Sequence, residues 1–155
     1  MFHVKHRPSI RRATIADTPT IVAIARAAYS KYVPRIGREP PPMVADFAAA
    51  IGRNVIAVAE ADGEVVGFMI AWPEPEGYLI DNVAVDPARQ KRGLGRQLIE
   101  HAASEARRLG LPALCLYTND AMTENLALYR RIGFVETHRA VENGLNRVYM
   151  RWDLP

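Results

Sequence analysis

The sequence predicts a mixed α/β fold in which a central, mostly antiparallel sheet of about seven strands is flanked by about four helices. Three observations lead to this prediction. Strand-like and helix-like segments follow one another in the order β-α-α-β-β-β-α-β-α-β-β. Asp62-Gly63 and Asn143-Gly144 are hairpin turn signals, so neighbouring strands run antiparallel. At 155 residues and 49% hydrophobic composition, the chain can bury a substantial core.

The N-terminal elements are a strand and two helices. Ser9–Ala13 is the strand, and Thr14 with Asp17 forms a capping-box pattern that starts a helix. Apolar residues at helical spacing carry this helix to about Ser30, and a loop follows over 32–42. A second helix is then predicted, because Met43, Phe47 and Ile51 lie one turn apart.

Three strands occupy the middle of the chain. Asn54–Glu60 and Glu64–Trp72 are predicted to form a hairpin, and Tyr78–Val85 follows a short turn. The next segment is a helix with one apolar face, ended by Gly110 and Pro112. That face is predicted to contain Leu94, Leu98, Ala102, Ala106 and Leu109.

The C-terminal elements are a strand, a helix and a hairpin. Leu114–Thr118 is the strand, and a helix near 122–132 stops at Gly133. The hairpin strands are predicted at about Phe134–Val141 and at Leu145–Asp153. No internal repeat is evident. We therefore predict a flexible tail over 1–8 and a single domain over 9–155.

Composition limits the class of protein. No apolar run is long enough to cross a bilayer, and the N-terminus lacks the apolar core of a secretory signal. The single cysteine, Cys115, fits a reducing cytoplasm. A net charge of +3 is compatible with an anionic ligand but too diffuse to predict nucleic-acid binding. Neither a metal cluster nor a membrane association is predicted.

The segment after Val85 has the features of an anion site. A strand runs into a glycine-punctuated helix start, where main-chain N–H groups lack helical partners and the helix dipole is positive. First turns usually carry acidic residues, yet this segment carries four cations and no acid before Glu100. We expect it to bind phosphate; the alternative is a solvated basic face on loop glycines. The cations are Arg89, Lys91, Arg92 and Arg96.

Three motifs resemble those of the GNAT N-acetyltransferase superfamily. Asp81-Asn-Val-Ala-Val-Asp-Pro87 is similar to the family's central strand. Gln90-Lys-Arg-Gly-Leu-Gly95 matches its Gln/Arg-x-x-Gly-x-Gly/Ala acyl-CoA loop. Leu128-Tyr-Arg-Arg-Ile-Gly-Phe134 is similar to its closing motif. The order of the elements also agrees, so the resemblance covers about 9–153 and implies a GNAT-like acyl-CoA N-acyltransferase fold.

The resemblance implies an enzyme that moves an acetyl group from acetyl-CoA, its co-substrate, to a primary amine by direct attack. The family's central strand splays from its neighbour and pairs with the pantetheine arm, which implies main-chain contacts from Val83, Ala84 and Val85. An N–H near Val85 would stabilise the developing oxyanion. Glycines let the backbone approach the diphosphate. The implied diphosphate contacts are Gln90, Lys91, Arg92, Gly93, Leu94, Gly95 and Arg96.

Tyr129 is the residue that the family match favours as general acid, because a positioned phenol can protonate a departing thiolate. From the helical pattern alone, a core tyrosine is the alternative. The candidate bases are Asp81, Glu76 and Glu60, and ordered water could serve instead. The family often carries an asparagine where this chain has Met122. Asn119 or Asn125 could supply that cofactor contact, and Asn119 could equally be a helix N-cap.

The acceptor pocket is expected from the segment between the first two helices, and the acceptor itself is a small-molecule or protein amine. Arg35 and Arg38 could bind a carboxylate on it, with exposed loop arginines as the alternative. Two rival functions are a non-catalytic acyl-CoA sensor and a phosphate-binding module unrelated to CoA. A homodimer through the last two strands is left open. The expected acceptor-binding residues are Tyr29, Tyr32, Arg35 and Arg38.

Overall fold

The computed structural model describes residues 8–89 and 92–155, which fold around a seven-stranded sheet. The strand order is β1-β2-β3-β4-β5-β7-β6, and every neighbouring pair is antiparallel except the parallel pair β4–β5. The predicted mixed, mostly antiparallel sheet is therefore confirmed. The strands are β1 (Ser9–Arg12), β2 (Ile56–Ala61), β3 (Glu64–Glu74), β4 (Gly77–Val85), β5 (Ala113–Asn119), β6 (Val135–Glu142) and β7 (Leu145–Asp153).

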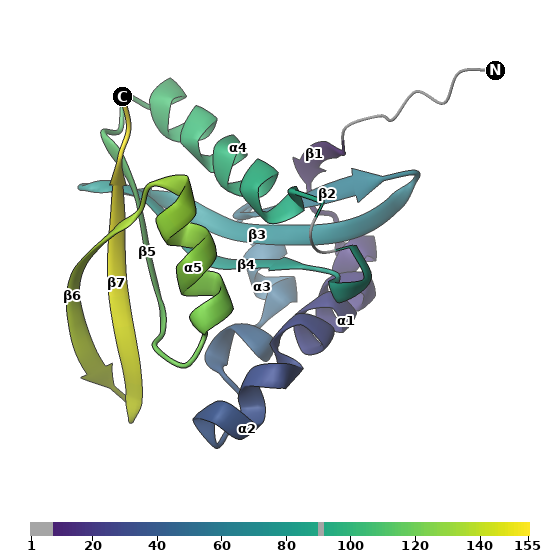
Figure 1. The fold of residues 1–155 in the computed structure, drawn as a ribbon. Coiled ribbons are helices and arrows are strands. Elements are labelled where there is room, and N and C mark those ends of the chain that lie inside the picture. The colour runs from purple at the N-terminus through teal and green to yellow at the C-terminus, as the bar shows by residue number, and fades with distance from the viewer. Residues whose placement is uncertain (1–7, 90–91) are drawn as a thin grey trace.

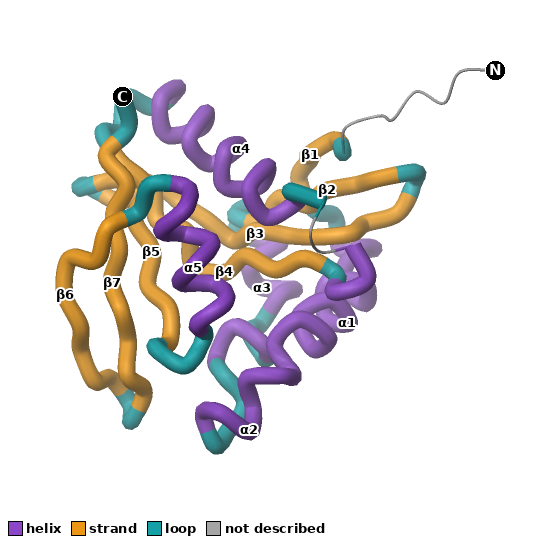
Figure 2. The backbone as a smooth tube through the Cα atoms, in the orientation of Figure 1, coloured by secondary structure: helices purple, strands orange, loops and turns teal. Residues whose placement is uncertain are grey.

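The helices cover both faces of the sheet. Figure 1 shows α4 and α5 on one side and α1, α2 and α3 on the other. In the same view β3 and β4 run across the molecule, whereas β5, β6 and β7 run from top to bottom (Figures 1 and 2). The sheet thus turns sharply between β4 and β5. The helices are α1 (Thr18–Tyr29), α2 (Val33–Ile36), α3 (Phe47–Gly52), α4 (Leu94–Arg108) and α5 (Thr123–Ile132).

Two hydrophobic clusters fill the space between sheet and helices. One lies with α4 and α5 and contains Leu98, Ile99 and Phe134. The other lies with α1 and α3 and contains Ile21, Phe47 and Phe68, whose ring meets that of Phe47 edge to face at 5.4 Å. Because each face of the sheet buries its own cluster, side-chain parity along a strand decides which face a residue serves.

The predicted second helix is wrong in its extent. Pro41–Met43 forms one short 3-10 turn, and α3 begins only at Phe47. The proline run at 40–42 removes main-chain donors and cannot continue an α-helix. Asp46 then caps α3, since its carboxylate accepts from the Ala49 N–H at 3.0 Å. The preceding loop also contains helical turns at Ser30–Tyr32 and in α2.

The two predicted hairpins are confirmed. Asp62 and Asn143 adopt positive φ values of 53° and 51°, each followed by a glycine with positive φ, as a two-residue turn of the primed type requires. β2 pairs with β3, and β6 with β7, across these turns. Local turn chemistry was therefore a sound guide to strand pairing.

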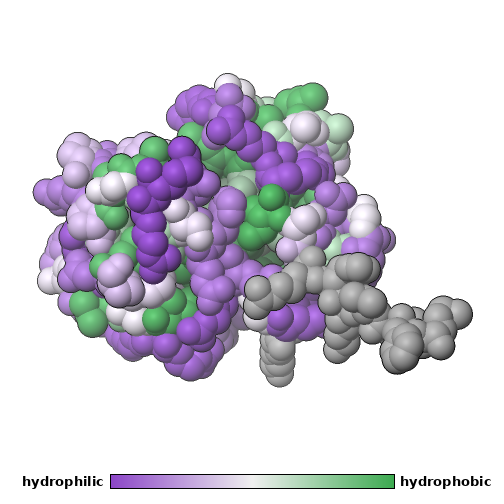
Figure 3. All heavy atoms as spheres, turned by 90° about the horizontal axis from the view of Figure 1, so that it is seen from above, coloured by the Kyte–Doolittle hydropathy of each residue, from purple (hydrophilic) through white to green (hydrophobic). Residues whose placement is uncertain are grey.

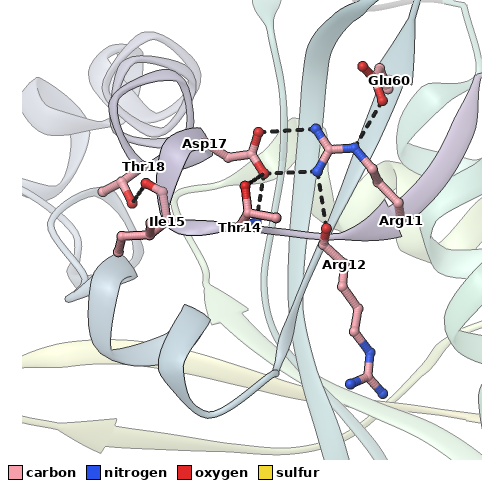
Figure 4. Close-up of polar contacts among 7 residues, drawn as sticks. All are labelled: Arg11, Arg12, Thr14, Ile15, Asp17, Thr18 and Glu60. Atoms are coloured by element: carbon pink, nitrogen blue, oxygen red, sulfur yellow. Dashed lines mark hydrogen bonds and ion pairs between the residues drawn. The ribbon is translucent and has the colours of Figure 1, made fainter.

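The first strand is fixed to the fold by a charged cluster (Figure 4). Arg11 on β1 donates to Asp17 at 2.9 and 3.1 Å, and its Nε donates to Glu60 on β2 at 2.9 Å. Asp17 also accepts from the Thr14 N–H at 2.7 Å, which supports the predicted cap. Arg11 lowers the pKa of Asp17 to about 2. The cluster ties β1, β2 and the start of α1 together.

The long helix α4 is amphipathic. Leu94, Leu98, Ala102 and Ala106 are buried as predicted, but Leu109 lies beyond the last helical residue and is 43% exposed. Seen from above, hydrophilic side chains cover much of the molecule, with smaller hydrophobic areas between them (Figure 3). Among the described residues, no helix is long and apolar enough to cross a bilayer.

Candidate active site

β4 and β5 stop pairing halfway along their length. Their parallel register covers Tyr78 with Leu114, Leu79 with Cys115, and Ile80 with Leu116, yet β4 continues to Val85. The β3–β4 register shifts at this point, because Ile70 pairs with Asn82 and Ala71 with Ile80. Asp81 is therefore the extra residue of a β-bulge, and bulges bend a strand away from its partner.

A cavity of about 290 Å³ lies where the two strands separate. It receives side chains from both faces of the sheet. Tyr129 belongs to the cluster with α4 and α5, whereas Val148 and Met150 of that cluster alternate with Arg147 on β7. Arg147 therefore reaches the cavity from the opposite face. The cavity can thus present two reactants to each other from opposite faces of the sheet.

Tyr129 lines the cavity as a buried side chain on α5. Its ring packs against Phe134 at 5.8 Å, and its hydroxyl makes no side-chain hydrogen bond to any residue described. Burial, with a smaller contribution from Tyr32, raises the pKa of Tyr129 far above its usual value. The phenol therefore keeps its proton at neutral pH.

Asp81 is the acidic residue among those described that line the cavity. Its Oδ1 accepts from the Tyr117 hydroxyl at 3.2 Å. Burial raises the pKa of the Asp81 carboxyl, while this hydrogen bond and the charges of Arg147 and Arg53 oppose the rise. Burial and the neighbouring Asp81 charge raise the pKa of Tyr117 to about 12. A carboxylate with a raised pKa is a better proton acceptor than an exposed one.

The other two candidate bases lie elsewhere. Glu60 is held by Arg11 in the cluster of Figure 4. Glu76 lies in the β3–β4 turn, where its main-chain carbonyl accepts from Arg151 at 3.1 Å. Neither lines the cavity, so Asp81 is the predicted base that geometry favours.

A buried polar network holds the opened part of β4. The Tyr29 hydroxyl, on α1, donates to Asn82 Oδ1 at 2.7 Å and lies 3.1 Å from the Val83 carbonyl oxygen. The Asn82 amide in turn donates to the Pro42 carbonyl at 2.9 Å. Tyr29 lines the cavity, but its hydroxyl is committed to this network, and acceptor binding by Tyr29 stays a prediction. Tyr29 therefore links α1, β4 and the proline run.

The main chain of β4 alternates between two directions. Asp86 N donates to Val66 O on β3 at 2.8 Å, so Ala84 also directs its polar groups to β3. Val83 and Val85 direct theirs to the side where β4 and β5 separate. The predicted cofactor contacts of these three residues stay predictions. The main-chain groups of Ala84 point to β3, so they are not directed to the side where a cofactor would pair with β4.

The asparagines predicted near Tyr129 both line the cavity. Asn119 Oδ1 accepts from the Ala121 N–H at 2.9 Å, which makes a turn before α5. The N-cap position belongs to Met122, so the alternative role of Asn119 as N-cap is wrong. Met122 is buried, and its sulfur receives contacts from Thr118 at 3.4 Å and from Asn125 at 3.8 Å.

The three remaining residues predicted for the acceptor lie outside the cavity lining. Arg35 donates to Glu124 on α5 at 2.7 Å, and the buried Tyr32 ring lies 5.2 Å beneath its guanidinium. Arg38 donates to the Asn143 carbonyl at the β6–β7 turn. These contacts fix the segment that carries the proline run, and acceptor binding by Tyr32, Arg35 and Arg38 stays a prediction.

The predicted phosphate loop precedes α4. Gln90 and Lys91 lie outside the described residues. Gly93 caps the helix with a φ of 75°, which favours glycine, and a Cβ there would meet nothing within 4 Å. At Gly95 a Cβ would lie 3.5 Å from a Leu128 methyl, an ordinary van der Waals contact, so packing against α5 would also accept alanine there.

Two of the predicted cations have carboxylate partners. Arg89 contacts Glu64 at 3.0 Å, and Arg96 contacts Glu100 at 3.3 Å. Arg92 is exposed, and the first turn of α4 has no acidic residue. The helix start therefore keeps its unfavourable basic composition, although part of that charge is balanced by nearby acids.

Sequence reasoning missed Arg147 and Tyr117. Both line the cavity, and the Arg147 guanidinium carbon lies 4.6 Å from the centre of the Tyr117 ring. Parity along each strand was visible in the sequence. The pairing of β5 with β7, which brings the two residues together, was not. Within the described ranges, no group of three or more His, Cys, Asp or Glu residues is arranged to hold a metal ion.

Comparisons with known proteins agree on one family. The model of the acetyltransferase (GNAT) domain matches residues 52–136, which is more than half of the chain. An L-methionine sulfoximine/L-methionine sulfone acetyltransferase of Pseudomonas paraeruginosa is 31% identical over 137 residues, 81% of this chain and 79% of that protein.

A [ribosomal protein bS18]-alanine N-acetyltransferase of Salmonella typhimurium is 37% identical over 76 residues, 49% of this chain. The match spans about half the length of that relative, 51%. The crystal structure of PaiA N-acetyltransferase from Thermoplasma acidophilum, in complex with coenzyme A, superposes with a TM-score of 0.77 at 15% identity. It covers 96% of this chain and 100% of that one, so the fold is shared.

Proposed function

The chain belongs to the GNAT acetyltransferase family, and on that premise we propose that it transfers an acetyl group from acetyl-CoA to a primary amine. The observation that carries the proposal is the early end of β4–β5 pairing at Ile80 and Leu116, with Tyr129 and Asp81 in the cavity that results. The proposal takes Tyr129 as the proton donor and Asp81 as the proton acceptor at the point where the two strands separate.

The residues present fit an acyl-CoA. The part of β4 beyond Ile80 directs the Val83 main chain away from β3, which suits pairing with an extended amide-containing arm. The start of α4 suits a diphosphate, because Gly93 turns the chain and no acid repels an anion in the first turn. Bound acetyl-CoA supplies the thioester that the amine attacks.

We assign the proton transfers to two side chains. Asp81 accepts the proton that the amine loses, directly or through water, since burial raises the pKa of its carboxyl. Tyr129 donates a proton to the departing sulfur, since burial keeps its phenol protonated. A main-chain N–H near Val85, other than that of Ala84, is the proposed partner for the carbonyl oxygen as it gains charge. No covalent enzyme intermediate is part of the proposal.

The acceptor is an amine of a small molecule or of a protein. The Pseudomonas relative is named for small amino-acid analogues, and the Salmonella relative for the alanine of a ribosomal protein, so the relatives include both kinds. A cytoplasmic location and a homodimer also stay predictions. β6 forms one edge of the sheet and exposes Val135 and Val141, which is where a second copy would pair.

Two measurements test the proposal. Thermal unfolding with acetyl-CoA should show stabilisation, by about 2.7 kcal/mol at a hundred times the dissociation constant, whereas ATP and GTP should have little effect. Free-thiol release with a panel of amines should then show turnover. Binding without turnover on any amine would favour the acyl-CoA sensor. Stabilisation by nucleotides but not by acetyl-CoA would favour the unrelated phosphate-binding module.

A further inference from the structure

The cavity contains one charge of each sign. Of the described residues that line it, Asp81 is the acidic one and Arg147 the basic one, and the others are apolar or neutral. They come from different strands, β4 and β7. A buried site that presents both a carboxylate and a guanidinium is suited to a ligand that itself carries both charges.

Tyr117 organises this pair. Its hydroxyl donates to Asp81 at 3.2 Å, and its ring lies 4.6 Å below the Arg147 guanidinium. Tyr117 in turn packs against Tyr149 at 5.5 Å. One aromatic side chain therefore orients both charged groups, so their separation is set by the rigid sheet rather than by flexible loops.

Arg147 is paired with one carboxylate and retains donors for a ligand. Its Nη1 contacts Glu142 Oε2 at 3.0 Å, and its side chain is only 16% exposed. The Tyr149 hydroxyl donates to the other oxygen of Glu142, which spreads that negative charge. A guanidinium has five N–H donors, so one contact to Glu142 leaves a planar edge for a carboxylate.

The surroundings restrict the size of the acceptor. The proline run at 40–42 lines the cavity, and Arg38 fixes this segment to the Asn143 carbonyl. On the other side Arg35 joins the same segment to Glu124 of α5. A volume of about 290 Å³ is at the small end of ligand pockets and must also admit the acyl end of the donor.

We propose that the acceptor is a free α-amino acid or a close analogue, whose carboxylate binds Arg147 while its amine lies near Asp81. This inference rests on the proposed acetyltransferase function and names the substrate class of the same cavity. Arg147 then acts as a specificity-determining residue: it contacts the acceptor and neither accepts nor donates the transferred protons.

The test compares matched acceptors. Each amino acid of a panel is assayed by free-thiol release beside its carboxamide and its decarboxylated amine. We expect kcat/KM to be roughly 10- to 100-fold higher for the amino acid, the range given by hydrogen bonds to a charged group. In Arg147→Gln this preference should disappear, because activity on the amino acid falls to that on its carboxamide; loss of the Arg147 charge also raises the pKa of Asp81, which affects all acceptors alike. The KM for acetyl-CoA should stay unchanged.

Arg151→Gln is the matched control, because Arg151 lies on the same strand but contacts Asp153 and the Glu76 carbonyl outside the cavity. It should keep the preference, and Arg147→Lys should keep part of it. Thermal unfolding of each variant reports whether it folds. Equal activity of the wild type on the amino acid and on its carboxamide overturns this inference but does not contradict the proposed acetyltransferase function. Absence of both acetyl-CoA binding and turnover overturns the proposed function instead.

Discussion

Removal of one hydroxyl, in Tyr29→Phe, tests the network that holds the opened strand. In the wild type this hydroxyl donates to Asn82 Oδ1 at 2.7 Å, inside a region where Asn82 is 3% exposed. The variant keeps the ring and its packing but leaves a buried amide oxygen without its donor. A buried polar atom left unpaired costs about 1–3 kcal/mol. We therefore expect the free energy of unfolding to fall by that amount.

Urea unfolding followed by circular dichroism measures the change. Tyr78→Phe is the control, since Tyr78 is also partly buried but its hydroxyl makes no hydrogen bond within the described residues. The control should stay within about 0.5 kcal/mol of the wild type, as substitutions that disturb no partner usually do. Equal stabilities of Tyr29→Phe and Tyr78→Phe would refute the structural role of the network.

Three further predictions concern catalysis, acid stability and a close contact. Tyr129→Phe should lower kcat by about 10²- to 10⁴-fold in the free-thiol assay with little change in the KM for acetyl-CoA, and an unchanged kcat would exclude Tyr129 as proton donor. Because Arg11 lowers the folded-state pKa of Asp17 from 3.8 to about 2, the carboxylate contributes stability above pH 4 that is lost as the pH falls towards 2. In urea unfolding at pH 6, the free energy of unfolding of the wild type should exceed that of Asp17→Asn by about 1–2 kcal/mol, a range that allows for the partial exposure of Arg11. This difference should be smaller at pH 3, and an equal difference at both pH values would contradict the linkage. Gly133→Ala should lower the free energy of unfolding by at least about 2 kcal/mol in the same assay, because the φ of Gly133 is 133° and a Cβ there would lie 2.9 Å from the Trp152 ring nitrogen. A loss below about 0.5 kcal/mol, the usual effect of a substitution at an exposed site, would show that the Trp152 ring moves aside without cost.

Elements with strong local chemistry were predictable from the sequence. The hairpin turns, the capping pattern at Asp17 and the apolar face of α4 depend on residues close together in the chain. The predicted extent of the second helix was wrong because the apolar spacing of Met43 and Phe47 was given more weight than the three consecutive prolines before Met43. The predicted burial of Leu109 was wrong because α4 ends one residue before it.

The site was predictable only in part. Tyr129 was identified through a motif, Asp81 was one of three candidate bases, and the structure brings both to one cavity. Arg147 and Tyr117 could be identified only once the strand order was known. In the sheet β5 pairs with β7, although α5 and β6 separate these two strands in the chain. The bulge at Asp81 was equally hidden, since it reverses side-chain parity without any proline or glycine to indicate it.

The short parallel register between β4 and β5 has a mechanical consequence. Three residue pairs join the β1–β4 part of the sheet to the β5–β7 part, whereas the other pairings on each side are antiparallel and all are longer. A small rotation about this hinge would widen or narrow the space between Asp81 and Tyr129 while each part kept its own ladder intact. The contacts of Arg35 and Arg38 span that hinge, and their strength would therefore set how far it opens.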